Sequence, residues 1–376
     1  MILANAKVCD DNFCLIDADI EIDGDVISKI SPKMSGKTDR LDLSGCIILP
    51  GLIDLHIHGC AGGDTCDGTE QALRTMSSYL ASQGVTSFCP TTMTVSNDSL
   101  MKILKNVRDF MGSDAPGARA VGVHMEGPYI SPLKSGVQKS DHVHSPDWPE
   151  FQDIVRAFPD LIKIVDIAPE TSGAMEFIEQ AKKLCVVSMS HSAADYDIAM
   201  LSFEKGITHV THLFNAMNGI HHRSPGAAGA VLDNDSVMAE IICDGVHLHP
   251  AVIRIACRML GEDRSILVSD SMRAAGLPDG SYELGGQWIQ VRDGRTYFEN
   301  AQIAGSTTNL YQEAKNLLRY GIPWRQVIKS ASINPAKQLG MDTRTGSITP
   351  GKLADLLILD QHMEIRSVYI QGKKMA

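Results

Sequence analysis

Two histidines, His56 and His58, stand two residues apart in the apolar run PGLIDLHIHG (residues 50–59). An apolar run closed by glycine is typical of a buried β-strand, and side chains two apart on a strand point to the same face. Two imidazoles that converge at the end of one strand could ligate a divalent metal ion. Taken alone, the pair is explained more simply by two core histidines with ordinary hydrogen-bond partners.

Four further residues of ligand type stand at the ends of other strand-like runs: Glu126, His191, His212 and Asp270. Imidazole nitrogens and carboxylate oxygens are the ligands that zinc, iron and similar divalent ions prefer. Three of them have an ordinary alternative. Glu126 could form an ion pair with a lysine, and His191 or Asp270 could cap a helix. Five strand ends with ligand-type residues together favour a metal centre, because such a buried cluster is unfavourable without a cation.

The runs that carry these residues alternate with helical patterns. Apolar spacing predicts helices over residues 69–83, 97–111, 172–184 and 193–205. The strand-like runs are residues 52–58, 85–92, 120–126, 161–168, 185–191, 207–213, 237–243 and 265–270. Eight alternating units predict an α/β fold closed into a (β/α)8 TIM-like barrel, whose strands end at one mouth. The rival is an open doubly wound sheet, but the GCAGG run at residues 59–63 lacks the G-x-G-x-x-G spacing of its phosphate loop.

Both ends of the chain are rich in strand patterns instead. Residues 18–23 and 26–30 alternate on either side of a Gly24-Asp25 turn, which is typical of a hairpin, and residues 41–49 form another strand-like run. The C-terminal strand-like runs are residues 351–360 and 366–372. We therefore expect a small β-sandwich-like domain formed by both termini (residues 1–50 plus 345–376) beside a barrel of residues 51–344.

Composition limits the classes of partner. The 376 residues carry a formal net charge of −11, which argues against a nucleic-acid or anionic-membrane surface. No apolar run reaches the roughly 20 residues of a membrane-spanning helix, and the N-terminus lacks the pattern of a signal peptide. The nine cysteines are scattered without a CxxC pair, as suits free thiols in a reducing, cytoplasmic environment.

Seven segments together closely resemble the N-acetylglucosamine-6-phosphate deacetylase family of the amidohydrolase superfamily. They are residues 50–59 (PGLIDLHIHG), 124–128 (HMEGP), 189–191 (MSH), 211–217 (THLFNAM), 244–247 (DGVH), 268–271 (VSDS) and 304–306 (AGS). The first motif alone marks only the superfamily, whereas the set is specific and the resemblance spans about residues 49–360. It implies a distorted (β/α)8 barrel that is a metal-dependent hydrolase, a split β-domain and a homodimer.

The resemblance also implies roles for the ligand-type residues. Glu126, His191 and His212 would bind the primary metal, and His56 and His58 would form a second site bridged by Glu126. The chain keeps both of these histidines, so we expect one or two divalent ions, zinc or iron. Asp270 matches the catalytic aspartate of the family. In the implied reaction a metal lowers the pKa of its water toward roughly 7, and Asp270 moves the proton from that water to the departing amine.

The implied partner is a phosphorylated N-acetylated amino sugar. N-acetyl-D-glucosamine 6-phosphate is the first expectation, and the galacto epimer is the alternative. The implied substrate contacts are Val137, Gln138, Asn215, Ala216, Arg223, His247, Ile303, Ala304 and Gly305. Arg223 would bind the phosphate from across the dimer, since a guanidinium suits phosphate bidentately. Gln138 stands where many members have a histidine, and a glutamine can donate a hydrogen bond but cannot carry a positive charge.

Two alternative functions are disfavoured by the residues present, and two further histidines are expected to lie outside the metal site. A cyclic-amide hydrolase of the same superfamily would place a carboxylated lysine where Glu126 stands, and a non-catalytic scaffold would have lost ligands that are intact here. His209 has the opposite strand parity to His212, so we expect it to point toward the helices. His124 points to the same face as Glu126 but lies two residues earlier on the strand, deeper in the barrel. We therefore expect it to be a core residue or to support the metal ligands.

Overall fold

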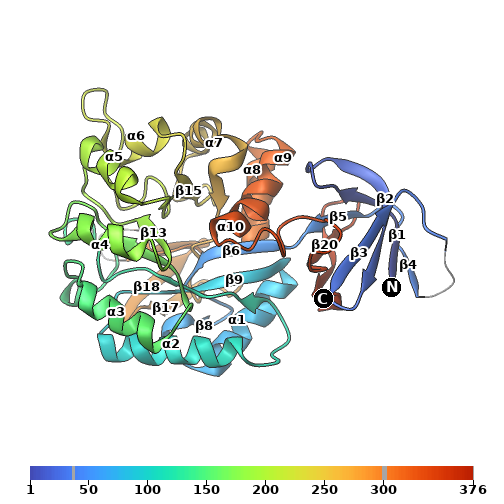
Figure 1. Cartoon of the computed structure of the whole chain (residues 1–376), viewed down its shortest axis with the longest axis horizontal. Coiled ribbons are helices and arrows are strands. Elements are labelled where there is room, and N and C mark those ends of the chain that lie inside the picture. Colours follow the sequence, from blue (N-terminus) through green and yellow to red (C-terminus); the bar gives the residue numbers. More distant parts are fainter. Residues whose placement is uncertain (36–38, 299–302, 376) are drawn as a thin grey trace.

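The computed structural model describes residues 1–35, 39–298 and 303–375 of the chain. Figure 1 shows a barrel flanked by helices and, beside it, a sheet that contains both the N-terminus and the C-terminus. Within the described residues, no helix combines the length and the apolar character needed to span a membrane. All nine cysteines lie in this part of the chain and are free thiols.

Eight parallel strands form the barrel, one in each of the eight predicted runs. They are β6 (Leu52–Ile57), β9 (Val85–Thr92), β11 (Val123–Met125), β12 (Ile162–Ile167), β13 (Val186–Met189), β14 (His209–Val210), β15 (Met238–Ile241) and β16 (Ser265–Leu267). A ninth short strand, β10 (Arg119–Ala120), pairs with the start of β9. A parallel bridge between Ile57 and Ser271 joins the first strand to the segment that follows the last strand. The barrel prediction is confirmed, and the open-sheet alternative is wrong.

Helices cover the outside and one end of the barrel. They are α1 (Glu70–Ser82), α2 (Asn97–Met111), α3 (Trp148–Ala157), α4 (Ala174–Ala181), α5 (Tyr196–Lys205), α6 (Gly226–Asp233), α7 (Pro250–Arg264), α8 (Leu310–Arg319), α9 (Trp324–Ala331) and α10 (Ile333–Gln338), with 3-10 turns η1 (Thr65–Asp67) and η2 (Ser140–His142). Of the four predicted helices, α2 has the predicted bounds and the other three are shorter. Helix α5 begins late because Asp195 caps it by accepting from the Ile198 N–H at 2.9 Å, so His191 is not its cap.

An apolar layer fills the barrel below the strand ends. All eight residues of β9 are buried, as expected for a parallel strand covered on both faces. Side chains from strands across the barrel form one buried cluster with Ala336 of α10: Ile53, Leu55, Cys89, Ile164, Ile242, Ile266 and Val268. The polar residues of the mouth therefore stand on a packed apolar base.

Within the part of the chain that the structure describes, the terminal sheet contains eight strands drawn from both ends. They are β1 (Ile2–Cys9), β2 (Leu15–Asp23), β3 (Val26–Ser31), β4 (Arg40–Asp42), β5 (Ile47–Pro50), β20 (Leu356–Leu359), β21 (Ile365–Ile370) and β22 (Lys373–Lys374). The sheet bends back on itself, because Ile27 donates its N–H to the Lys352 carbonyl and accepts from Gly351, both at 2.8 Å. The run at residues 41–49 is two strands rather than one, since Gly45 turns the chain at a φ of 79°. We propose residues 1–50 and 345–376 as the bounds of this small domain.

Two further small sheets lie near the mouth of the barrel. The glycine-rich residues 59–63 lie in a short hairpin, β7 (Gly59–Cys60) with β8 (Gly63–Asp64). After β16 the chain forms a three-stranded antiparallel sheet, β17 (Gly280–Leu284), β18 (Gln287–Arg292) and β19 (Arg295–Tyr297), which was not predicted. Its buried side chains pack against Met93, Met272 and Ala304, which fixes this sheet at the mouth.

Candidate active site

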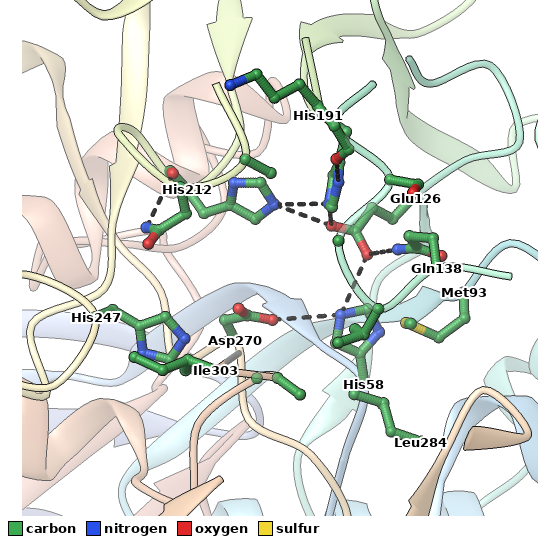
Figure 2. A pocket seen from close by; sticks show the side chains of 18 of the residues that line it. His58, Met93, Glu126, Gln138, His191, His212, His247, Asp270, Leu284 and Ile303 are labelled. Atoms are coloured by element: carbon green, nitrogen blue, oxygen red, sulfur yellow. Dashed lines mark hydrogen bonds and ion pairs between the residues drawn. The ribbon is translucent and has the colours of Figure 1, made fainter. Parts of the chain in front are cut away.

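The ligand-type residues at the strand ends converge at the barrel mouth. Among the described residues, three groups have ligand atoms within 4.8 Å of one another: His56/His58/Glu126, Glu126/His191/His212 and His56/His124/Glu240. The first two groups share Glu126 and face a cavity of about 650 Å³, in which Figure 2 shows His58, Glu126, His191, His212 and Asp270 pointing toward one another. The third group lies beneath them. The barrel thus brings together all six residues singled out from the strand ends.

The group around Glu126 presents acceptors to a common point. Nε2 of His191 and Nε2 of His212 each lie 3.1 Å from Glu126 Oε1 and 3.2 Å from each other. His191 Nδ1 lies 2.7 Å from the Lys134 carbonyl, so Nδ1 is the protonated nitrogen and Nε2 of the neutral ring offers a lone pair. Three converging acceptors repel one another unless a proton or a metal cation lies between them. The residues therefore fit a divalent ion.

The second group repeats this arrangement on the other side of Glu126. Nε2 of His56 lies 3.2 Å from Nε2 of His58 and 3.8 Å from Glu126 Oε1, and His58 Nε2 lies 3.4 Å from Glu126 Oε2. Asp270 Oδ1 is 3.3 Å from both ring nitrogens. His56 is fully buried behind His58, while Asp270 borders the cavity. These residues also fit a cation, with Asp270 beside it.

Left-handed backbone turns direct the side chains into the mouth. His191, His212 and Asp270 have φ values of 43°, 32° and 44°, which residues other than glycine rarely adopt. Such turns cost about 1–3 kcal/mol each, so the surrounding structure must hold them. At Asp270 the holding contact is its own N–H, which donates to the His56 carbonyl at 2.9 Å. After Glu126 the turn falls on Gly127, where a Cβ would lie 2.0 Å from Thr94 Oγ1.

The crowding of acceptors shifts the pKa values of the site. Burial alone would raise the pKa of Asp270, but the charges of the His56 and His58 rings outweigh burial and lower it to about 2. Burial would lower the pKa of His212, but its hydrogen bond to Glu126 and the charges of the carboxylates raise it to about 9. Burial would also lower the pKa of His58, but its hydrogen bond to Asp270 and the charges of Glu126 and Asp270 raise it to about 8. The site thus attracts positive charge, and a metal ion would displace these protons.

Eight of the nine implied substrate residues line the cavity. They are Val137, Gln138, Asn215, Ala216, His247, Ile303, Ala304 and Gly305. Arg223 does not line the cavity of its own chain, since it lies in an exposed loop before α6 with Nη1 2.6 Å from His222 Nε2. Lining residues that sequence reasoning missed are Met93, Leu133, Lys134, Ser135, Gly136 and Leu284. Among them Lys134 brings a positive charge, and Leu284 comes from the unpredicted sheet.

Gln138 is held against Glu126. Its Nε2 donates to Glu126 Oε2 at 2.5 Å, while its Oε1 accepts from the Thr94 N–H at 2.6 Å. The Thr94 contact fixes which end of the amide faces the carboxylate, because a backbone N–H can only donate. A neutral amide donor thus faces the Glu126 carboxylate from the cavity wall.

The expectation for His209 is wrong. The ring is fully buried, with Nδ1 3.0 Å from Ser188 Oγ and Nε2 3.6 Å from Glu240 Oε1, so it faces the barrel interior. Strand β14 ends at Val210 and the chain turns left-handed at His212, so alternation does not relate the two histidines. His124 is the expected supporting group, with Nδ1 3.0 Å from the Leu55 carbonyl and Nε2 2.9 Å from Asp166.

Buried carboxylates near the site were missed, among them Asp54 and Glu240. Asp54 accepts from Ser269 Oγ at 2.6 Å and from the Ser269 N–H at 3.2 Å, which joins β6 to the segment that carries Asp270. Glu240 lies on β15 and contacts His56. Each could have been found as a single acidic residue inside a largely apolar strand: Asp54 in LIDLHI and Glu240 in MAEIIC.

Comparisons with known proteins agree with this geometry. A sequence profile described as "Amidohydrolase family" matches residues 47–375. The chain is 38% identical over 331 residues to N-acetylglucosamine-6-phosphate deacetylase of Bacillus subtilis, covering 87% of this chain and 84% of that protein. It is 33% identical over 361 residues to N-acetylgalactosamine-6-phosphate deacetylase of Escherichia coli O157:H7, covering 96% and 95%. The crystal structure of N-acetylglucosamine-6-phosphate deacetylase from Pasteurella multocida superposes with a TM-score of 0.94 at 30% identity, covering 99% and 98%.

Proposed function

Because the chain belongs to the amidohydrolase family, we propose that this hydrolase converts N-acetyl-D-glucosamine 6-phosphate into glucosamine 6-phosphate and acetate. The observation that carries the proposal is the convergence of Glu126, His191 and His212 beside Asp270 at the mouth of the cavity. The two similar deacetylases support the choice of an N-acetylhexosamine 6-phosphate, and the Bacillus subtilis relative favours the gluco epimer.

The metal-binding part of the proposal rests on the two groups of acceptors. Glu126, His191 and His212 would hold one divalent ion, and His56 and His58, together with Glu126, would hold a second. Zinc and iron both suit imidazole and carboxylate ligands. A divalent cation bound there would supply Lewis-acid chemistry, which lowers the pKa of water toward about 7.

Asp270 carries the proton in the proposed reaction. Its carboxylate borders the cavity and stays ionised, so it is able to accept a proton from the attacking water. The water oxygen forms a bond to the acetyl carbon, and Asp270 then gives its proton to the amide nitrogen as the carbon–nitrogen bond breaks. The amine leaves as a neutral group, which the unprotonated nitrogen could not do.

The cavity and its neighbours bind the sugar phosphate. A volume of about 650 Å³ lies within the usual range for small-ligand sites, about 300–1,000 Å³. His247 Nδ1 lies 2.8 Å from Asp244 Oδ2, which orients the ring and leaves Nε2 available for a sugar hydroxyl. Gln138 donates near Glu126, and Asn215, Ala216 and residues 303–305 complete the wall. In a cytoplasmic homodimer, Arg223 completes the phosphate site of the other subunit.

The test is amine release from two substrates. The purified protein is stripped with a chelator, reloaded with zinc or iron, and assayed with N-acetylglucosamine 6-phosphate and N-acetylgalactosamine 6-phosphate. We expect activity only in the reloaded protein and a higher kcat/KM for the gluco substrate. A higher kcat/KM for the galacto substrate would reassign the epimer. Metal-loaded protein that releases amine from neither sugar would overturn the proposal.

A further inference from the structure

A layer of fully buried polar residues lies directly beneath the metal-binding groups, and the proposed reaction does not use it. Its members are His124, Asp166, His209 and Glu240, each 0% exposed. Burying charged side chains costs free energy unless each has a close partner. The partners of each residue therefore indicate what the layer does.

Glu240 has its short contacts with residues of both metal-binding groups. Its Oε2 lies 2.9 Å from His56 Nδ1 and accepts the backbone N–H of His212 at 3.1 Å. Its Oε1 lies 3.6 Å from His209 Nε2 and 3.8 Å from His124 Nδ1, beyond hydrogen-bond distance. One carboxylate oxygen thus joins a ligand of the second group to the backbone of a ligand of the first.

The contact with His56 fixes which nitrogen of that ring is free. An ionised carboxylate can only accept, so the proton between the two groups belongs to His56 Nδ1. The neutral ring then has its lone pair on Nε2, the atom that faces His58 Nε2 at 3.2 Å and Asp270 Oδ1 at 3.3 Å. Without this acceptor the ring could carry its proton on Nε2, where it would block a metal ion.

The contact with His212 supports a strained turn. His212 has a φ of 32°, and β14 ends two residues earlier, so the strand ladder does not hold its N–H. Glu240 supplies the acceptor, while its own carbonyl accepts the N–H of Leu213 at 2.9 Å. Residue 240 therefore holds the turn from both its side chain and its backbone.

We propose that Glu240 is a positioning residue that prepares His56 and His212 together as metal ligands. The inference rests on the metal-binding part of the proposed function. An acceptor on the far nitrogen of a ligand histidine orients the ring and raises its basicity, and removal of such an acceptor typically costs about 10–100-fold in metal affinity. Here a single oxygen serves ligands of both ions, so its loss weakens both sites.

The experiment measures zinc binding in Glu240→Met and Glu240→Gln, with Asp166→Asn as the matched control. Met keeps the length of the side chain and removes the acceptor, whereas Gln keeps one acceptor oxygen without the charge. Asp166 lies in the same buried layer but contacts His124 Nε2 and Thr211 Oγ1, at 2.9 Å each, rather than a proposed ligand. Zinc is titrated into metal-free protein against a competing chromophoric chelator, and a thermal melt is recorded for each variant.

We expect zinc affinity about 10–100-fold weaker in Glu240→Met, an intermediate loss in Glu240→Gln and a change of less than about threefold in Asp166→Asn. Wild-type zinc affinity in Glu240→Met, or an equal loss in Asp166→Asn, would overturn the proposal. So would wild-type protein that never takes up a second zinc ion, because His56 then has no ion to bind. None of these measurements involves the sugar, so failure of the deacetylase assay alone would leave the inference standing.

A second measurement needs no variant that could fail to fold. In zinc-loaded wild-type protein with 15N-labelled histidine, we expect a hydrogen-bonded Nδ1–H proton on His56 that exchanges slowly with water. A wild-type His56 that is protonated on Nε2, or not protonated on Nδ1, would overturn the assignment.

Discussion

At the scale of single residues, Asp270 is held by its backbone as well as by its ring partners. Its N–H donates to the His56 carbonyl at 2.9 Å, and its own carbonyl accepts from the Ser306 N–H at 2.7 Å. The side chain is therefore fixed with Oδ1 3.3 Å from both His56 Nε2 and His58 Nε2. A residue held in this way can lose its charge without losing its position.

This gives a prediction for Asp270→Asn. Asn keeps the shape and one hydrogen-bonding oxygen but cannot take up a proton near neutral pH. General acid–base help is typically worth about 10²–10⁴-fold, so the variant should fold and hold its metal while kcat falls by that factor or more. Metal content, melting temperature and kcat are measured side by side. A metal-loaded variant with near-normal kcat would remove Asp270 from the mechanism, and a variant without metal would make Asp270 a ligand.

The sequence predicted the residues at strand ends better than the residues within the barrel. His56, His58, Glu126, His191 and His212 were found because parallel strands all end at one mouth. The placement of His209 was wrong, because two-residue periodicity stops where a left-handed turn begins. Glu240 was missed for a related reason, since one charge in the apolar run MAEIIC has no periodicity that would show its partner across the barrel.

At the scale of elements, α8 supports the loop that carries His247. Glu313 of α8 is fully buried, and its Oε2 accepts the N–H of Cys243 at 2.8 Å, while Asn316 Nδ2 donates to the Cys243 carbonyl at 3.1 Å. Both contacts hold the chain just before Asp244, the partner of His247. Burial, with help from the Asp244 charge, raises the pKa of Glu313 well above its usual value.

The raised pKa predicts a pH-dependent effect of Glu313→Gln. Unfolded glutamate titrates near about 4.3, whereas folded Glu313 stays protonated, so wild-type stability is fully present below that pH. It then falls by about 1.4 kcal/mol per pH unit until the folded pKa is reached. Gln does not ionise, so the melting temperature of Glu313→Gln minus that of the wild type should increase from pH 5 to pH 8.

Thermal melts at several pH values check this, with Glu204→Gln as a control at the exposed end of α5. A difference for Glu313→Gln that stays constant across this range would mean that Glu313 is ionised in the folded protein. The same α8 contacts would then bind the Cys243 N–H with a charged acceptor, and the support of the His247 loop would depend on that charge.

Elements with strong periodicity were predicted, and an insertion was not. Helix α2 matches its prediction because Leu100, Ile103, Leu104 and Val107 recur at helical spacing and are buried. The sheet β17–β19 was missed although its turns, at Gly285-Gly286 and Asp293-Gly294, are typical of hairpins. This sheet follows the eighth barrel strand. In a simple (β/α)8 barrel only a helix follows that strand, so the alternation of strands and helices does not predict a sheet there.

At the scale of the whole molecule, the cavity of a single chain is short of positively charged side chains. The net charge is −11, Lys134 lines the cavity, and Arg223 lies in an exposed loop away from it. The same loop exposes Ile220 at 55% of its surface. These features support the proposal that a partner subunit covers this loop and receives Arg223 at its own phosphate site.

Arg223→Met tests that proposal with two substrates and a mixing experiment. A charge-assisted hydrogen bond is worth about 1.5–3 kcal/mol, so KM for the 6-phosphorylated sugar should rise about 10–100-fold. Turnover of the unphosphorylated sugar, which lacks the group bound by Arg223, should change little. Equal losses on both substrates would mean that Arg223 has a structural role.

Mixing then decides which chain supplies the guanidinium. A dimer of one Arg223→Met chain and one Asp270→Asn chain contains one site with an intact Asp270 that receives Arg223 from its partner. With the substrate well below the KM of Arg223→Met, each variant alone is nearly inactive, and random re-association of the two should restore activity at about a quarter of all sites. If Arg223 serves its own chain, or if the protein is a monomer, no mixture has a site with both residues and activity stays at the level of the separate variants.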